Sequence, residues 1–550
     1  MKSIGFKNFR RFEELLPLQL GDITFFVGAN NAGKSTAVKA MMLMLDNLAS
    51  RSVVNRNNIF EPPGFRLDAN RIHEVHIGTF GRALHRPYPE TKELTIAATI
   101  DNYLVRYTIT GDTDSRQANA DVAKIEVENV VDKVCYVFDF QNGESVVNYN
   151  TSVLKKYAVG IDEGVPFEYI LRRGGVQGYR RETREKMEMQ QQLEQLLQTK
   201  ARLQHEQKRE DNPIEIARIN SELQSIEKNI KTIQKMADPF EGKLKEEDVE
   251  YKSTIKISHR MMVGNFVSAV IEGLTEDFVG EEESSEDYSS ASADRKYDKL
   301  SKQKKAFLMM LMSDARQLSM VVRSNRIEYI SAHAASQKVL FSIEDKNDYM
   351  AGVIREFKQR SIMPGSKEDL FVTTWMKNLQ IGLDYQIEPI SGEAYTMDIT
   401  NMCGETMPLA DLGMGSIQMM ILLLKLATII NANRGEGCVI IVEEPEQNIH
   451  PKLQSKLADL IAYVNREYGF RFVIETHSEY LIRRTQAMIA TEEVQFEKNP
   501  FKVYYFPEEG EPYDMVYQES GLFKKKFDEG FFDEASRQHV VVIKKVRELQ

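Results

Sequence analysis

The sequence predicts an α/β protein with a phosphate-binding loop, an antiparallel β subdomain and an inserted antiparallel coiled-coil hairpin. Three observations predict this architecture: apolar strand-like runs that alternate with helical stretches, a block of alternating apolar and polar residues from 93 to about 148, and a heptad pattern between 179 and 236. With 550 residues and 42% apolar content, the chain is long enough for a sizeable core and for three or four structural units.

The phosphate-binding loop is the most informative segment. It runs Gly28-Ala29-Asn30-Asn31-Ala32-Gly33-Lys34-Ser35, between an apolar run at 23–27 and a helical stretch at 36–42. This strand–loop–helix context is what the motif requires, because the loop amides and the helix N-terminus both attract phosphate. A glycine-rich turn without function is the alternative. We expect nucleotide contacts from Asn30, Gly33, Lys34, Ser35 and Thr36, and expect the Ser35 hydroxyl to coordinate Mg²⁺.

The segment from 93 to about 148 predicts an antiparallel sheet inserted after the first helix. Runs at 94–100, 103–109 and 134–138 are rich in the β-branched and aromatic residues typical of strands. Asp101-Asn102 separates the first two runs, which suits a two-residue hairpin turn.

The polar, helical segment between 179 and 236 predicts the coiled-coil hairpin. Its second half repeats an apolar residue every three or four positions, at Ile216, Ile219, Leu223, Ile226, Ile230 and Ile233, and a weaker seam precedes it. Asp211-Asn212-Pro213 lies between the seams and can end one helix and begin the next. The hairpin either contacts a partner or another copy of the chain, or is a purely structural helical pair.

Composition divides the chain into four predicted parts. Residues 1–175 form a first lobe, 176–238 the hairpin, 239–325 a helical and acidic connector, and 326–550 a second lobe with a tail. The connector includes an acidic, serine-rich stretch from 276 to 298 that is too poor in aliphatic residues to order itself. That stretch is either a flexible linker or lid, or a plain surface loop.

Two strand-like runs in the second lobe end in candidate catalytic residues. The run 439–442 precedes Glu443 and Glu444, and the run 472–474 precedes Glu475-Thr476-His477. Glu443 can hold Mg²⁺ through water, Glu444 can orient and deprotonate the attacking water, and His477 can bind the γ-phosphate or that water. Acids or a histidine after a strand are often only structural, but the upstream phosphate-binding loop makes these residues candidates.

A glycine-rich helix start at 413–418 is a further candidate anion site. The small residues precede an apolar helix over 419–430, and a helix N-terminus attracts anions. An ordinary glycine-capped loop is the alternative. The candidate nucleotide contacts in this segment are Gly413, Gly415, Ser416 and Gln418.

In this order, the segments resemble those of ABC-type AAA ATPases of the SMC, Rad50 and OLD type. Residues 28–35 are similar to Walker A and 413–418 to the signature loop. Glu443 and Glu444 are similar to Walker B with its catalytic glutamate, and His477 to the switch histidine. Residues 443–451 and 475–478 look especially like the OLD group. The first strand, which contains Asn8-Phe9-Arg10, also looks like that group, in which this segment lies near the nucleotide. A glutamine loop has no clear match, and 77–80 is the nearest candidate.

The resemblance implies an ABC-type P-loop ATPase head that uses ATP and Mg²⁺. It also implies a head-to-tail dimer, or a higher oligomer, in which the 413–418 loop of one subunit completes the ATP site of the other. Full OLD proteins carry a Toprim-type nuclease domain, and the 73 residues after His477 are too few for one. The architecture is most similar to PtuA-type ATPases of Septu and retron-associated anti-phage systems, and the ATPase of the PARIS defence system is related.

PtuA-type ATPases act with a separate HNH-type nuclease, and the retron systems include a reverse transcriptase with its DNA and RNA. The resemblance therefore implies a nucleotide-controlled regulator of an effector nuclease. A Rad50- or SMC-like DNA-repair ATPase that acts directly on DNA is the main alternative, and a transporter subunit is a third. The net charge of −11 argues against general nucleic-acid binding, although Lys524-Lys525-Lys526 keep a DNA contact open.

Composition also indicates in which cellular compartment the protein is expected. No run of 18 apolar residues is present, so we expect no membrane span and no membrane partner. Three widely separated cysteines argue against a disulfide scaffold or a structural zinc site and favour the reducing cytoplasm.

Overall fold

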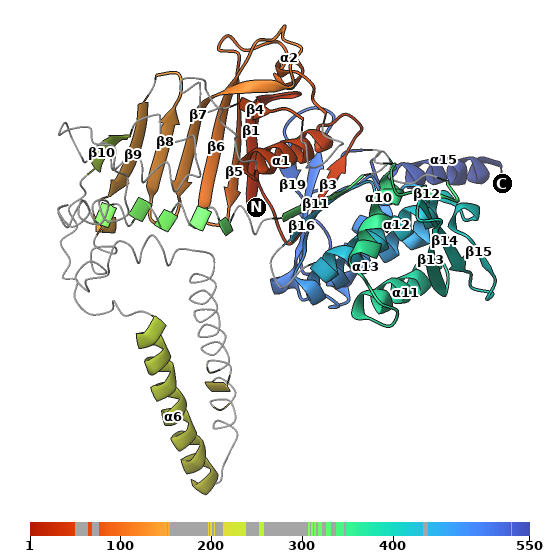
Figure 1. Cartoon of the computed structure of the whole chain (residues 1–550). Coiled ribbons are helices and arrows are strands. Elements are labelled where there is room, and N and C mark those ends of the chain that lie inside the picture. Colours follow the sequence, from red (N-terminus) through yellow and green to blue (C-terminus); the bar gives the residue numbers. More distant parts are fainter. Residues whose placement is uncertain are drawn as a thin grey trace. The chain divides into compact units, whose positions relative to one another are not determined.

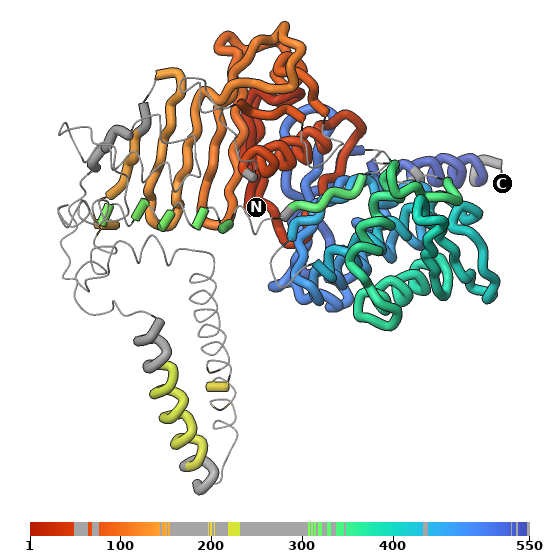
Figure 2. The backbone as a smooth tube through the Cα atoms, viewed as in Figure 1, coloured from red at the N-terminus to blue at the C-terminus, as the bar shows by residue number. Residues whose placement is uncertain are grey.

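The computed structural model describes residues 1–49, 64–68, 76–142, 144–150, 152–154, 213–237, 252–257, 326–331, 337–345, 348–432, 438–529 and 531–549, with isolated helical residues between 196 and 203 and between 306 and 321. The chain forms two compact units (Figures 1 and 2). Unit 1 comprises Met1–Val146, Ser258–Phe266 and Arg316–Gln550, and unit 2 comprises Val147–Ile257 and Val267–Ala315.

A six-stranded sheet in the order β11-β16-β17-β3-β18-β19 forms the centre of unit 1 (Figure 1). The first five strands run parallel and β19 is antiparallel to β18. Their bounds are β11 (Arg326–Ile330), β16 (Cys438–Glu443), β17 (Arg471–Glu475), β3 (Ile23–Gly28), β18 (Phe501–Phe506) and β19 (Tyr513–Asp514). β3, β16 and β17 are almost fully buried, which explains their continuous apolar runs. Because parallel strands end at the same edge, the loops after these three strands meet there.

The helices that accompany this sheet are α1 (Lys34–Ala49), α10 (Tyr349–Gln359), α11 (Lys367–Asn378), α12 (Met414–Ala432), α13 (Pro451–Tyr468) and α14 (Glu479–Ala490). α12 packs against both α10 and α11 and is apolar on nearly every side. Within the described part of the chain it is the one helix long and apolar enough to cross a membrane, but 72% of that apolar window is buried inside the protein. A buried core helix accounts for the same composition.

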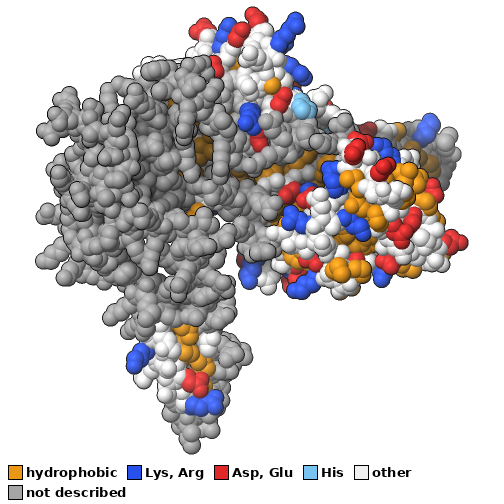
Figure 3. Space-filling model, in the orientation of Figure 1, with side chains coloured by type: hydrophobic (Ala, Val, Ile, Leu, Met, Phe, Trp, Pro, Cys, Tyr) orange, Lys and Arg blue, Asp and Glu red, His pale blue; other side chains and the backbone are white. Residues whose placement is uncertain are grey.

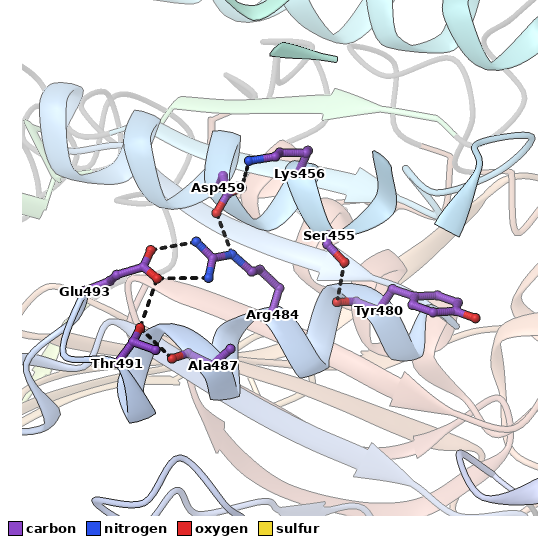
Figure 4. A network of polar contacts seen from close by, with 8 residues as sticks. All are labelled: Ser455, Lys456, Asp459, Tyr480, Arg484, Ala487, Thr491 and Glu493. Carbon is purple, nitrogen blue, oxygen red and sulfur yellow. Dashed lines mark hydrogen bonds and ion pairs between the residues drawn. The ribbon is translucent and has the colours of Figure 1, made fainter. Parts of the chain in front are cut away.

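A polar network holds α14 against α13 (Figure 4). The Arg484 guanidinium donates to Asp459 Oδ1 at 2.7 Å and to both carboxylate oxygens of Glu493, at 3.0 and 2.6 Å. Such paired charge-assisted bonds are among the stronger hydrogen bonds in proteins. α13 follows the loop after β16 and α14 follows the loop after β17, so the network fixes the helices behind both loops.

The antiparallel sheet of unit 1 has the order β8-β7-β6-β5-β1-β2, with β4 beside β7. Its strands are β1 (Ser3–Phe9), β2 (Phe12–Gln19), β4 (Gly64–Arg66), β5 (Glu93–Ile100), β6 (Tyr103–Thr110), β7 (Asn119–Asn129) and β8 (Val134–Asp139). Ile100 pairs with Tyr103, so Asp101 and Asn102 form the predicted two-residue turn, with Asp101 at φ 52°. The sequence did not predict β7, nor that β1 and β2 join this sheet.

Smaller elements complete unit 1. A second antiparallel sheet contains β12 (Phe341–Ser342), β14 (Ala394–Thr400), β13 (Asp384–Ile390) and β15 (Thr406–Pro408). The short helix α2 (Phe80–Ala83) and the 3-10 turns Leu409–Asp411 and Phe496–Lys498 lie in connections. The last helix, α15 (Glu534–Leu549), was not predicted, and it exposes Val540, Val541, Val542, Ile543 and Val546.

Strand β9 (Glu144–Asn150) begins in unit 1 and ends in unit 2, which also contains β10 (Lys252–Ile257) and α6 (Pro213–Ala237). α6 is the predicted second arm of the hairpin. Lys200 lies in the predicted first arm and its Nζ pairs with Glu227 Oε1 of α6 at 2.8 Å. Most of the first arm, and the whole acidic stretch 276–298, lie outside the described residues. The predicted fold class is confirmed: an α/β head, an antiparallel β subdomain and an inserted helical arm.

Candidate active site

The loop after β3 encloses the side chain of its own lysine. Lys34 Nζ donates to the carbonyl oxygens of Gly28 at 3.1 Å and Ala29 at 2.8 Å. Burial lowers the pKa of Lys34, and the charges of Glu475, Glu444 and Glu446 act in the opposite direction. The ammonium group is therefore held at the loop, at the N-terminus of α1, which is an anion-binding position.

Two glycines give the loop its shape. Gly28 has φ 147°, and a Cβ there would lie 2.1 Å from the Phe506 carbonyl oxygen of β18. Gly33 has φ 101°, and a Cβ there would lie 2.3 Å from the Phe12 ring. Only glycine fits either position, so the tail strand β18 and the strand β2 both support the loop.

Ser35 joins the loop to the end of β17. Its Oγ donates to Glu475 Oε1 at 2.7 Å, and Glu475 is paired in register with Glu443 of β16. The pKa of Glu475 is raised to about 7, mainly by burial; the Ser35 hydrogen bond acts to lower it and the nearby Glu443 charge acts to raise it. Glu475 Oε2 is buried and has no hydrogen-bond partner among the described residues. One hydroxyl and two carboxylates, with one carboxylate oxygen unpaired, are a donor set that fits Mg²⁺.

Glu444 and His477 face each other across the same edge of the sheet. His477 Nε2 lies 3.7 Å from Glu444 Oε1, and Gln447 Nε2 donates to Glu444 Oε2. The Glu444 backbone has φ 40°, in the left-handed region, and its N–H donates to the Glu475 carbonyl at 2.7 Å. A non-glycine residue held in this strained conformation is typical of functional sites.

Glu446 connects the loop after β16 to the loop after β17. Its side chain is only 9% exposed, and its Oε1 accepts a hydrogen bond from the His477 backbone N–H at 2.6 Å. Burial raises the pKa of Glu446. Burial, and then the Lys34 charge, lower the pKa of His477, which favours a neutral imidazole.

Most of these side chains line one cavity of about 930 Å³, within the range of small-molecule sites. The predicted residues that line it are Asn30, Gly33, Lys34, Ser35, Thr36, Glu444 and His477. Glu443 does not line it but lies beside Glu475 in the sheet. The remaining polar lining includes Glu475, Asn31, His85 and five cations, Arg10, Arg11, Lys39, Arg82 and Arg86.

A family described as "AAA ATPase domain" matches residues 1–482. The chain belongs to this family. None of the curated proteins matches it. The membership agrees with a phosphate-binding loop whose Ser35 hydroxyl is hydrogen-bonded to the Glu475 carboxylate at the end of the neighbouring strand β17, and it makes this AAA ATPase a nucleotide-binding protein.

Solved structures similar to this AAA ATPase include three SMC head domains. One, from Pyrococcus furiosus with an extended coiled coil and bound to the C-terminal domain of ScpA, is 9% identical, with 99% of each chain covered and a TM-score of 0.29. Another, from Pyrococcus yayanosii with a coiled coil and joint, is 11% identical, with 94% of this chain and 97% of that chain covered and a TM-score of 0.33. The Thermotoga maritima head is 8% identical, with 95% and 96% covered and a TM-score of 0.30.

The glycine-rich start of α12 does not line the cavity of the same subunit. A Cβ at Gly415 would lie 2.4 Å from the Asn448 carbonyl oxygen, so this glycine packs against the loop after β16. Gln418 is buried, and its side-chain amide lies 3.5 Å from the Ser331 carbonyl oxygen. Gly413 is exposed, and no atom would lie within 4 Å of a Cβ at this position. Ser416 is half-buried.

Two parts of the site were missed by the sequence interpretation. Glu475 was recognised within a motif but received no role, although an acid at a strand end before Thr476-His477 was a usable signal. The segment nearest to a glutamine loop, residues 77–80, begins α2, whose Arg82 lines the cavity and whose N-terminus is capped by Thr79. A cation, Arg82, thus lines the cavity two residues after the segment where a glutamine was sought.

Proposed function

We propose that this AAA-family ATPase hydrolyses ATP to ADP and phosphate in a head-to-tail dimer, and that the nucleotide state controls a partner effector nuclease in anti-phage defence. The observation that carries the ATPase step is the convergence of Lys34, Ser35, Glu444 and His477 on one cavity. Phosphoryl transfer needs positioning and charge neutralisation more than covalent help, and these four side chains offer both.

Each side chain has a distinct task in this proposal. Lys34 and the loop amides bind the β- and γ-phosphates. Thr36, at the N-terminus of α1, is a further nucleotide contact. Ser35 and Glu443, with Glu475, are the residues that would hold Mg²⁺, which would neutralise phosphate charge. Glu444 accepts a proton from the attacking water, and the neutral His477 beside it orients that water or the γ-phosphate.

The location of the glycine-rich start of α12 supports the proposed dimer. Gly413, Gly415, Ser416 and Gln418 are absent from the cavity lining in their own subunit. A small-residue helix start that is partly exposed can reach the γ-phosphate of a second subunit, and the exposed Gly413 and the half-buried Ser416 are its most accessible residues. ATP would then hold two subunits together and hydrolysis would release them.

The partner is proposed to be an HNH-type nuclease in the cytoplasm, with a reverse transcriptase and its DNA or RNA as an additional component. The exposed aliphatic residues of α15 support contact with another protein chain, because exposed apolar clusters of this kind mark interaction sites. The helical arm α6 is a second candidate contact.

Direct action on DNA is the second candidate function. The exposed residues Lys524, Lys525 and Lys526 favour it. Against it, the face in Figure 3 shows acidic and basic side chains interspersed over the described surface, which is unlike the continuous basic footprint of a DNA-binding face.

The test is a steady-state ATPase assay on the purified full chain, followed by co-purification with proteins encoded next to it. ATP hydrolysis that requires Lys34, together with retention of a nuclease, supports the proposal. Hydrolysis stimulated by DNA in the absence of any retained nuclease favours the second candidate.

A further inference from the structure

The side chain of Gln447 holds the carboxylate of the proposed general base. Gln447 lies four residues after the end of β16, and its Nε2 donates a hydrogen bond to Glu444 Oε2. Gln447 is half-buried and does not line the cavity, whereas Glu444 does. Any influence of Gln447 on the reacting groups would therefore pass through Glu444.

A tight turn brings the two residues together. The Gln447 backbone N–H donates to the Glu444 carbonyl at 3.1 Å. Pro445 occupies the second position of this four-residue turn, where its fixed φ is favourable. Gln454 of α13 anchors the end of the same loop, because its Nε2 donates to the Ile449 carbonyl at 2.9 Å. The side-chain bond is therefore the second between Gln447 and Glu444, within a loop that is itself anchored.

This bond gives the two oxygens of the Glu444 carboxylate different surroundings. Oε2 accepts from the Gln447 amide, and Oε1 lies 3.7 Å from Nε2 of His477, which also lines the cavity. A carboxylate has several acceptor positions, so an amide bound to one oxygen leaves the other able to accept. The oxygen on the His477 side is thus the one that can receive a proton from the attacking water.

Without the amide, the Glu444 carboxylate has a competing partner in the Lys34 ammonium group. Burial lowers the pKa of Lys34, and the Glu444 charge is one of three that act to raise it, so the two groups interact. A carboxylate that moved towards Lys34 would neutralise the charge that the proposed function assigns to phosphate. The Gln447 amide is neutral, so it restrains Glu444 without adding a charge to the site.

We propose that Gln447 is a positioning residue for hydrolysis, which orients the Glu444 carboxylate so that Oε1 accepts the proton of the attacking water. The proposal rests on the proposed function, because it assumes that Glu444 is the general base. A base is effective only within hydrogen-bond reach of its proton, and a small misplacement costs much of the rate. Gln447 therefore affects the turnover number, whereas nucleotide affinity depends on the phosphate-binding loop.

The test uses Gln447→Met in the full chain, because methionine keeps the length of the side chain but cannot donate. Gln386→Met is the matched control, since Gln386 is exposed on β13 and does not line the cavity. ATPase assays give kcat, and competition with a fluorescent analogue gives the Kd for AMP-PNP. We expect Gln447→Met, but not the control, to lower kcat about tenfold with Kd within twofold. Gln447→Glu, which replaces the donor with a second carboxylate, should lower kcat at least as much, and it decides the test if the methionine variant does not fold.

A double variant separates positioning from a structural role. If Gln447 acts through Glu444, adding Gln447→Met to Glu444→Gln should change single-turnover hydrolysis less than twofold, because the base is already absent. A further tenfold loss in the double variant, or equal losses in kcat and nucleotide affinity, would overturn the proposal in favour of a structural role. Unchanged kcat in the Gln447 variants would overturn it as well. Wild-type turnover by Glu444→Gln would instead refute the proposed function, and the positioning role with it.

Discussion

Ser35 Oγ lies 2.7 Å from Glu475 Oε1, although the two residues are 440 positions apart in the sequence. The contact exists because β17 lies between β3 and β16 in the sheet, which brings the end of β17 beside the phosphate-binding loop. Glu475 is therefore part of the site, and its burial has consequences for stability.

Glu475→Gln should change how stability depends on pH. The pKa of Glu475 is raised by burial to about 7 in the folded chain, against about 4.3 in an unfolded one. The stabilisation from the bound proton, on the order of 3–4 kcal/mol, is fully present below about pH 4 and is lost as the pH rises to about 7. Glutamine resembles the protonated acid, so in EDTA the melting temperature of the variant relative to wild type should rise between pH 5 and 8. The exposed Glu388→Gln is the control, and parallel curves for Glu475→Gln and wild type would contradict the prediction.

Glu446→Ala should lower the turnover number more than the nucleotide affinity. Its carboxylate holds the His477 backbone N–H at 2.6 Å and does not line the cavity. Loss of this bond should let the His477 loop shift and reduce kcat about tenfold or more, with the Kd for AMP-PNP within twofold. Glu446→Gln keeps an acceptor oxygen and should recover much of kcat. Equal losses in kcat and in nucleotide affinity would indicate a purely structural role.

Gly28→Ala should destabilise the fold. The added Cβ would lie 2.1 Å from the Phe506 carbonyl oxygen, and φ 147° is unfavourable for alanine. We expect a loss of about 2 kcal/mol or more, measured by urea denaturation. Gly352→Ala is the matched control, because it lies within α10 and its Cβ would meet only Arg355 Nη2 at 3.9 Å. That control should be stabilised by about 0.5–1 kcal/mol, and equal stability of the two variants would refute the account of the loop.

The strands that carry the site could be predicted from local sequence, but the contacts between them could not. β3, β16 and β17 are continuous apolar runs followed by polar residues, which is a local signal. The Ser35–Glu475 bond depends on strand order, and the contact of Gly28 with Phe506 depends on β18 lying beside β3. Both are long-range pairings that no local pattern encodes. Arg82 was missed for the same reason, because the β1–β2 turn brings its segment to the cavity.

Lys34→Ala and Ser416→Arg subunits should complement each other when mixed. Ser416 does not line the cavity of its own subunit, so the dimer proposal places it against the nucleotide of the partner. A mixed dimer would contain one site with both wild-type residues, and ATPase activity should recover to about half of the wild-type rate per mixed dimer. Each variant alone should be inactive but folded. No recovery at any mixing ratio, with dimer formation verified by light scattering, would count against the head-to-tail arrangement.

The most direct measurement of the central claim is ATP binding and hydrolysis by wild type, Lys34→Ala and Glu444→Gln, assayed side by side. Glu444 lies 3.7 Å from His477 and lines the cavity, so it is the proposed general base. Its loss should lower kcat about 10²-fold or more while ATP stays bound, whereas Lys34→Ala should abolish binding. Wild-type turnover by Glu444→Gln, or undiminished ATP binding by Lys34→Ala, would contradict the account.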